Sequence, residues 1–214
     1  MYSTTLDRPS NRFWDNIAPK YAQKRIADPV AYEAKLSRVR ALLNTTHRVL
    51  EIGCGTGSTA LQLAPHIAHM TATDVSRGMI NVAQSKLAPN APTNVTFRQA
   101  DAADLIEGHP FDVICAFSLL HLVEDVPKVL DRVRAQLKPG GLLISKTECL
   151  KNRSAVTRGF VSALTAIGLA PRVTLLSDSD LHRHLRTAGF VIEQSAYLGA
   201  SRSNPFIIAR RADV

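Results

Sequence analysis

A glycine-rich turn at the end of a short apolar stretch constrains this chain more than any other feature. Val49–Ile52 has strand-forming character and runs directly into Gly53–Gly57, after which a helical pattern begins at Ser58. A short apolar run of this kind predicts a buried parallel strand. Glycines let the backbone turn tightly and let a ligand approach the main chain. The stretch therefore predicts a strand, a loop and a helix whose N-terminus presents free N–H groups to a polar or anionic ligand.

Two carboxylates follow the next predicted strands. Asp74 ends an apolar stretch, Met70–Thr73, and a carboxylate at that place can bind ribose hydroxyls. Asp101 follows a further strand predicted at residues 95–97, where it can accept a hydrogen bond from the exocyclic amine of adenine. The pair predicts a nucleoside pocket in which one carboxylate binds the ribose and the other binds the base. The alternative for Asp101 is that it only caps the next turn.

The same residues carry a family resemblance. Glu51–Gly57, written E-x-G-C-G-T-G, resembles motif I of the class I S-adenosylmethionine-dependent methyltransferases, and Ser58 stands where the nicotinamide fingerprint requires glycine. Three further segments agree with that family in order and spacing: residues 73–76 with Met79, residues 99–102, and residues 137–141. The resemblance spans Arg48 to Thr147.

The resemblance implies an α/β fold with a doubly wound, Rossmann-like, seven-stranded sheet whose final strand is antiparallel. It further implies one methyltransferase domain over residues 1–214. Within it we expect an N-terminal helical lid at 1–47, a cofactor-binding core at 48–147, and acceptor-side helices with the terminal strands at 148–214. The cofactor implied is S-adenosylmethionine, with S-adenosylhomocysteine as product and no metal.

Site residues transfer to this chain through the matched motifs. By resemblance, Glu51 helps to hold the amino group of the methionine moiety. An aromatic side chain of the lid, Trp14 or Tyr21, would cover the sulfonium, because an aromatic face attracts a cation; simple packing is the alternative. The residues expected to bind the cofactor are Tyr21, Glu51, Gly53, Cys54, Gly55, Thr56, Gly57, Asp74, Val75, Ser76, Met79, Asp101, Ala102, Phe117 and Ser118.

A general base is less clearly indicated. His121 lies near the carboxyl end of the strand predicted at residues 111–117, close to where an acceptor must lie. A purely structural histidine is the alternative. The same region reads Phe-Ser-Leu-Leu-His and lacks the Asn/Asp-Pro-Pro-aromatic run of family members that methylate adenine or amide nitrogens, so nucleic-acid methylation at adenine N6 is disfavoured.

Helical and strand patterns predict the remaining elements of the chain. A short apolar-faced helix is predicted to end before Pro19, and a longer helix to begin at Pro29. The helix that begins at Val126 is predicted to stop at Lys138–Gly141, with glycine in the C-cap region and a strand from Leu142. An amphipathic helix is predicted within residues 151–169, and two antiparallel edge strands at 190–193 and 205–209.

Charge is distributed unevenly along the chain. The net charge of +8 divides into +5 for residues 1–48, −1 for residues 49–147 and +4 for residues 148–214. The basic excess thus lies in the segments that flank the cofactor core. It indicates a solvated surface, an anionic substrate or an anionic membrane surface.

The acceptor remains open at this stage. A small molecule with a nitrogen or oxygen nucleophile comes first. A phospholipid amine methylated at the membrane surface is the second reading, with Lys151, Arg153 and Arg158 as its basic contacts. RNA or protein has only net basicity in its favour, and a non-catalytic S-adenosylmethionine-binding regulator is a further reading. The N-terminus lacks the apolar core of a signal peptide, so we expect a cytoplasmic protein, with peripheral association at the inner membrane face as the alternative. The oligomeric state is unknown.

Overall fold

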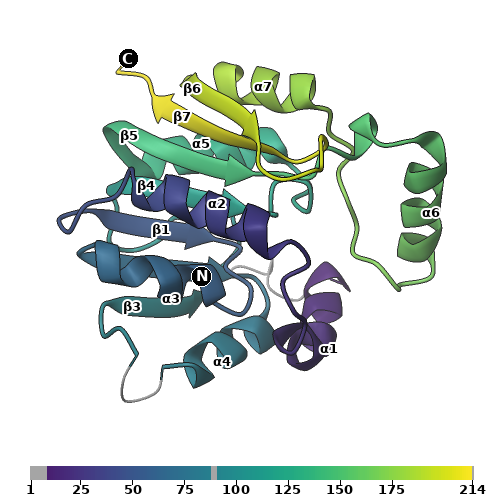
Figure 1. The fold of residues 1–214 in the computed structure, drawn as a ribbon, viewed down its shortest axis with the longest axis horizontal. Coiled ribbons are helices and arrows are strands. Elements are labelled where there is room, and N and C mark those ends of the chain that lie inside the picture. Colours follow the sequence, from purple (N-terminus) through teal and green to yellow (C-terminus); the bar gives the residue numbers. More distant parts are fainter. Residues whose placement is uncertain (1–8, 88–90, 214) are drawn as a thin grey trace.

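A seven-stranded sheet organises the molecule, in the order β3-β2-β1-β4-β5-β7-β6 (Figure 1). The computed structural model describes residues 9–87 and 91–213. Its strands are β1 Arg48–Ile52, β2 His69–Asp74, β3 Val95–Gln99, β4 Phe111–Phe117, β5 Leu137–Lys146, β6 Phe190–Tyr197 and β7 Pro205–Arg211. The first five strands pair in parallel, and β7 lies antiparallel between β5 and β6. The predicted α/β sheet with an antiparallel final strand is confirmed.

Helices cover both faces of this sheet (Figure 1). They are α1 Pro9–Ala22, α2 Pro29–Arg40, α3 Ser58–Leu63, α4 Arg77–Ser85, α5 Val126–Gln136, α6 Ala155–Ala166 and α7 Asp178–Thr187. One apolar core lies between the sheet and α2, α3 and α4, and a second lies between the sheet and α5 and α7. Side chains alternate between the faces of a strand, so Val49 enters the first core and Leu50 the second.

Local chemistry sets most of the helix boundaries as predicted. Ser76 caps α4 by accepting a hydrogen bond from the Met79 amide, and Asp125 caps α5 in the same way through the Lys128 amide. Pro65 ends α3 early, and the chain continues as a single 3-10 turn at Ala64–His66.

Two predicted boundaries are wrong. Helix α1 does not end before Pro19 but continues to Ala22. A proline in a helix interior costs about 3 kcal/mol, and packing of α1 on α4 offsets this cost. Gly78 makes the approach possible, because a Cβ atom at that position would lie 3.0 Å from the Asp15 carbonyl oxygen.

The second wrong boundary concerns Lys138–Gly141. Helix α5 already ends at Gln136, and Leu137 is extended, with φ −81° and ψ 149°. The Pro-Gly-Gly run therefore belongs to the irregular start of β5, where the pairing register with β4 shifts between Phe111 and Val113. A salt bridge from Lys138 to Asp112 holds this segment on β4.

Helix α6 differs from the other α-helices because none of its residues is buried. All of its residues are at least partly exposed, and in Figure 1 it stands apart from the sheet as an arm. It occupies the middle of the amphipathic segment predicted at residues 151–169. In the described part of the chain no helix has the length and apolar character needed to cross a bilayer. The predicted loop residues Pro89 and Asn90, and residues 1–8 of the predicted lid, lie outside the described residues.

Candidate functional site

A cleft of about 910 Å³ lies at the carboxyl ends of β1, β2 and β4. Its edge is the glycine loop, in which Gly55 adopts φ +53°, a left-handed conformation that favours glycine. A Cβ atom on Gly55 would meet nothing within 4 Å, so this peptide faces open space. Gly57 is glycine for another reason: its Cβ would lie 2.6 Å from Phe97 Cζ, between α3 and the sheet. One glycine leaves room for a ligand and the other allows close packing.

Asp74 supports the glycine loop from the end of β2. Its Oδ2 accepts a hydrogen bond from the Gly55 amide at 2.8 Å, and its Oδ1 accepts one from the Ser76 amide at 2.9 Å. Burial raises the pKa of Asp74, while the two amides oppose this rise. The carboxylate therefore fixes the loop and also lines the cleft.

Glu51 is almost fully buried, at 2% exposure, and lines the cleft from β1. Its Oε2 atom has no hydrogen-bond partner among the described residues. Burial raises the pKa of this carboxyl to about 8, and the nearby Lys35 works in the opposite direction. A buried acceptor without a donor is costly. Glu51 therefore marks a place where the cleft lacks a hydrogen-bond donor.

Lys35 on α2 is a site residue that sequence reasoning missed. It is only 5% exposed, lines the same cleft, and donates a hydrogen bond to Thr59 Oγ1 at 3.2 Å. Its Nζ lies 4.4 Å from the Tyr32 ring centroid and 4.3 Å from that of Phe117, within cation–π range. Burial lowers the pKa of Lys35 to about 8, and Glu51 opposes this.

The signal for Lys35 was present in the sequence. Tyr32, Leu36 and Val39 form the apolar stripe of α2, and Lys35 lies three residues after Tyr32, on the same face. A lysine within a core-facing stripe needs a buried partner or a ligand. Within the described chain no salt bridge joins Lys35 to Glu51, so an amine and a carboxyl group face the cleft separately while each influences the pKa of the other.

The predicted lid helix is held against the cofactor core. Asp15 of α1 accepts hydrogen bonds from the Gly78 amide at 2.8 Å and from Ser76 Oγ at 2.6 Å, at the N-terminus of α4. A carboxylate is favoured there by the free amides and the helix dipole. Trp14 and Tyr21 line the cleft, with their rings edge to face at 6.2 Å between centroids. Both predicted aromatic candidates therefore lie in position to contact a ligand.

Most of the predicted cofactor residues come together in this cleft. The members that line it are Tyr21, Glu51, Gly53, Cys54, Gly55, Thr56, Asp74, Val75, Met79, Asp101, Ala102, Phe117 and Ser118. Gly57 and Ser76 do not line it and act behind it, in packing and capping. Asp101 accepts a hydrogen bond from the Ala103 amide at 2.9 Å through Oδ1, so it both caps a turn and faces the cleft.

Ser118 is the only non-glycine residue with positive φ in the described chain, at φ +54°. It follows β4, its amide donates to the Lys146 carbonyl at 2.7 Å, and it lines the cleft. Such conformations cost about 1–3 kcal/mol and cluster at functional sites. The strained turn directs the loop that follows it, from Leu119 to Asp125, along the cleft.

His121 lies on that loop but does not itself line the cleft. Its Nδ1 is buried without a partner among the described residues. Burial lowers the pKa of His121 to about 4, with Glu148 acting in the opposite direction. The imidazole is therefore neutral near pH 7 and able to accept a proton.

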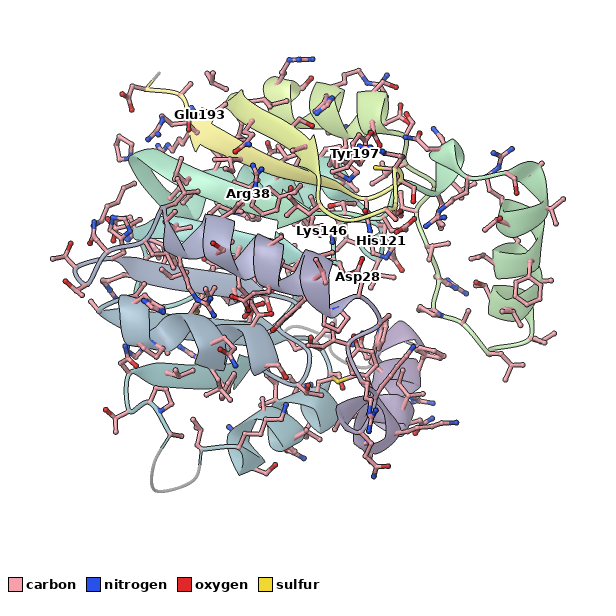
Figure 2. All side chains as sticks on the ribbon, in the orientation of Figure 1. Asp28, Arg38, His121, Lys146, Glu193 and Tyr197 are labelled. Atoms are coloured by element: carbon pink, nitrogen blue, oxygen red, sulfur yellow. The ribbon has the colours of Figure 1, made fainter. Side chains whose placement is uncertain are left out.

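A group of charged side chains lies near His121. Figure 2 shows His121, Lys146 and Asp28 in one region, beside the carboxyl end of β5. Burial lowers the pKa of Lys146, and the carboxylates of Asp28 and Glu148 oppose this. Lys146 pairs in register with Phe117 of β4, one of the residues lining the cleft. This region is thus the polar border of the cleft.

The three cations predicted to meet a membrane are engaged within the protein. Lys151 forms a salt bridge with Asp180 at 2.7 Å, and Arg153 forms one with Glu148 at 3.0 Å. Arg158 Nη1 donates to the carbonyl oxygens of Lys151 and Arg153 at 3.3 and 2.8 Å. These contacts place all three side chains in the link between β5 and α6.

Comparison with known proteins agrees with this geometry. A family model described as "Methyltransferase domain" matches residues 49–141. A ubiquinone biosynthesis O-methyltransferase from Coxiella burnetii is 31% identical over 162 residues, covering 75% of this chain and 67% of the relative. The chain belongs to the class I S-adenosylmethionine-dependent methyltransferases. The methyltransferase is also 27% identical over 198 residues to highly reducing polyketide synthase 40 from Fusarium mangiferae, covering 83% of this chain.

The share of each relative that is matched differs widely. The methyltransferase chain spans 8% of the polyketide synthase and 66%, 60% and 67% of three ubiquinone biosynthesis O-methyltransferases. Among solved structures, the DhpI–SAH complex has 23% identity and a TM-score of 0.73, covering 99% of this chain and 100% of that one. At this level of identity the likeness shows the fold alone.

The residues present fit the family's cofactor. The amino-acid end of S-adenosylmethionine carries an ammonium and a carboxylate, and the methyltransferase cleft offers the buried Glu51, whose Oε2 atom has no partner, and a separate Lys35. The open face of Gly55 leaves room for the ligand beside the main chain, and Asp74 lies next to it. The chemistry of the donors and acceptors thus matches a zwitterion joined to a nucleoside.

Proposed function

We propose that the chain transfers a methyl group from S-adenosylmethionine to a small-molecule acceptor with a nitrogen or oxygen nucleophile. The observation that carries the proposal is that two buried side chains able to carry opposite charges, Glu51 and Lys35, face one cleft without forming a salt bridge with each other. Neutral or singly charged ligands leave one of these charges unsatisfied, whereas a zwitterion satisfies both. The neighbouring loop, with Gly55 open and Asp74 behind it, supports a ligand whose other end is a nucleoside.

Under this proposal Glu51 accepts from the ammonium and Lys35 donates to the carboxylate of the methionine moiety. Asp74 accepts from the ribose hydroxyls and Asp101 from the adenine amine. Trp14 and Tyr21 present aromatic surface to the sulfonium. Gly53, Cys54, Thr56, Val75, Met79, Ala102, Phe117 and Ser118 form the remaining walls. Each of these roles is an expectation for this chain that ligand-binding variants test.

S-adenosylmethionine supplies a methyl group already activated as a sulfonium, so the protein mainly aligns the acceptor and excludes water. The acceptor's lone pair forms the new bond to the methyl carbon while the carbon–sulfur pair returns to sulfur. His121, neutral near pH 7, accepts the proton that the acceptor releases. The unpartnered Nδ1 of His121 and its place on the loop that borders the cleft support this assignment.

A small molecule is favoured over a phospholipid because of where the basic residues act. Lys151, Arg153 and Arg158 were the contacts that motivated a membrane acceptor, and each is engaged within the protein. Lys151 and Arg153 are partly exposed, but a paired carboxylate offsets each of their charges and weakens a surface attraction that needs about 1 kcal/mol from each cation.

Two measurements test the proposed function. Calorimetry should show binding of S-adenosylmethionine and S-adenosylhomocysteine by the intact chain. A screen of small phenols and amines should then give S-adenosylhomocysteine as product, with His121→Asn lowering turnover about 10²–10⁴-fold while cofactor affinity stays unchanged. A protein that binds neither compound contradicts the proposal, and one that binds both but methylates nothing supports a regulatory role.

A further inference from the structure

A second cavity adjoins the cofactor cleft. It has a volume of about 800 Å³ and lies between α1 and residues 165–172, which end α6 and follow it. Tyr21 and Lys24 line both this groove and the cofactor cleft. Figure 1 shows α1 and the arm of α6 on the same side of the molecule. The two cavities are therefore neighbours that share part of their lining.

The lining of this groove combines apolar surface with positive charge. Phe13 and Ile17 of α1 provide one apolar wall, and Leu169, which is 68% exposed, provides the other. The cations are Arg12, Lys20, Lys24 and Arg172. All lining residues belong to the described part of the chain, and none of them is a carboxylate. A ligand that matches this wall has an apolar body and an anionic group.

The outer wall is tied to the cofactor cleft by hydrogen bonds. The Thr174 amide donates to the His121 carbonyl at 2.7 Å, and Thr174 Oγ1 donates to the Val123 carbonyl at 2.6 Å. Thr165 Oγ1 closes the turn after α6 by donating to the Pro171 carbonyl at 3.0 Å. The groove wall is thus anchored on the same loop that carries the candidate base.

We infer that this groove binds the acceptor and that the acceptor is an amphipathic anion, with an apolar chain or ring system and a carboxylate, phosphate or sulfonate group. This inference rests on the proposed function and names the substrate class. The apolar body packs on Phe13, Ile17 and Leu169, and the anion meets Lys20 and Arg172. The nucleophile then reaches the cleft past Tyr21, which lines both cavities.

Decanoate is a suitable probe, because it carries one carboxylate on one apolar chain. Binding is followed by calorimetry with S-adenosylhomocysteine present, and by fluorescence of Trp14, the only tryptophan, whose ring lies 5.2 Å from that of Phe13. We expect saturable binding of one decanoate per chain. Decanol, which lacks the charge, and acetate, which lacks the chain, should each bind at least about tenfold more weakly, because charge and apolar contact contribute separately.

Charge reversal separates the groove from the rest of the basic surface. The variant Lys20→Glu/Arg172→Glu should lower decanoate affinity about tenfold or more at low salt, since two attractions become repulsions. Arg38→Glu on the outer face of α2 is the matched control and should leave decanoate affinity unchanged. S-adenosylhomocysteine affinity should be the same in wild type and both variants.

Four results would overturn the inference. The first is that a chain able to bind S-adenosylhomocysteine shows no saturable decanoate binding, and the second is that Lys20→Glu/Arg172→Glu binds decanoate as tightly as wild type. The third is a preference for phosphatidylglycerol vesicles over monomeric decanoate. The fourth is a dimer, seen by sedimentation, that decanoate dissociates. The third would assign the groove to a lipid surface and the fourth to a second copy of the chain. Failure to bind S-adenosylhomocysteine instead contradicts the proposed function.

Discussion

The proposed cofactor side and the proposed acceptor side of this molecule are built in opposite ways. Around the glycine loop, backbone amides, Asp74 and the Asp15 contact at α4 form a closed set of hydrogen bonds over buried strands. On the proposed acceptor side, none of the residues of α6, all of which the structure describes, is buried in either core. The first side is held together by hydrogen bonds within the protein. The second exposes apolar surface that a ligand would cover.

This difference explains what each side contributes to specificity. A binding site common to a family can be preformed, because its ligand never changes. The wall formed by α6 and the residues that follow it is attached mainly through Thr174 and the segment near Leu150, so its sequence can change without disturbing the sheet.

Gly55→Val should have the largest effect. The side chain would enter the open space beside the loop and would strain a residue at φ +53°, so S-adenosylhomocysteine affinity should fall by more than about 100-fold. Gly140→Val is a matched control, because Gly140 has φ +68° and equally open surroundings, outside the cleft. Calorimetry that finds equal losses in both variants would attribute the effect to backbone strain.

Lys35→Met should weaken S-adenosylhomocysteine binding by about 10–100-fold, the equivalent of one charge-assisted hydrogen bond of about 1.5–3 kcal/mol. The fold should persist, because methionine suits the apolar stripe of α2. Arg38→Met, on the exposed face of the same helix, should leave affinity unchanged. Unaltered affinity in Lys35→Met would remove Lys35 from the cofactor site.

The affinity for S-adenosylhomocysteine should rise between about pH 6 and pH 8. Burial raises the pKa of Glu51 to about 8, so the carboxyl is mostly protonated below that pH and must ionise to accept from the ammonium. The affinity for S-adenosylhomocysteine should rise by at most about tenfold per pH unit, because one group titrates. Glu51→Gln should bind more weakly and show a flat profile, whereas an unchanged slope in that variant would implicate another group.

Asp15→Ala should loosen the predicted lid by removing two hydrogen bonds at the N-terminus of α4. Hydrogen exchange over residues 10–22 should quicken by about five- to thirtyfold, the equivalent of 1–2 kcal/mol. Asp131→Ala, an exposed change on α5, serves as the control. Adding S-adenosylhomocysteine should slow exchange over residues 10–30 in wild type, and equal exchange with and without it would contradict a lid.

Phe160→Ser should have the smallest effect. Phe160 is 65% exposed on α6, so the free energy of unfolding should change by less than about 0.5 kcal/mol in urea titration. Leu130 is fully buried on the inner face of α5, and Leu130→Ala should lower the free energy of unfolding by about 2–5 kcal/mol. A large loss in Phe160→Ser would mean that α6 is packed against something in solution.

Most residues predicted to bind the cofactor line one cleft, and their signals in the sequence are local. A strand entering glycines, a serine cap at Ser76 and a carboxylate at the end of β2 each act within a few residues. The cation facing Glu51 was missed because Lys35 reaches it through tertiary packing, from a helix whose apolar stripe drew attention only to its hydrophobic members. The extension of α1 through Pro19 was missed for the same reason, since the compensating contact at Gly78 is distant in sequence.

The proposed acceptor side was predicted least well. Basic residues near α6 were interpreted by charge alone, yet Lys151 and Arg153 find carboxylates within the fold. The groove between α1 and Leu169 joins segments about 150 residues apart, and no periodicity along the chain indicates such a contact.

The position of β7 has a consequence for the nascent chain. Because β7 lies between β5 and β6, the open side of β5 stays unpaired until residues 205–211 have left the ribosome. An exposed strand edge is a template for pairing with other chains. The hairpin of β6 and β7 joins neighbouring segments and can form quickly, so it should dock onto β5 as a unit. Aggregation during synthesis should therefore depend on how soon this hairpin closes.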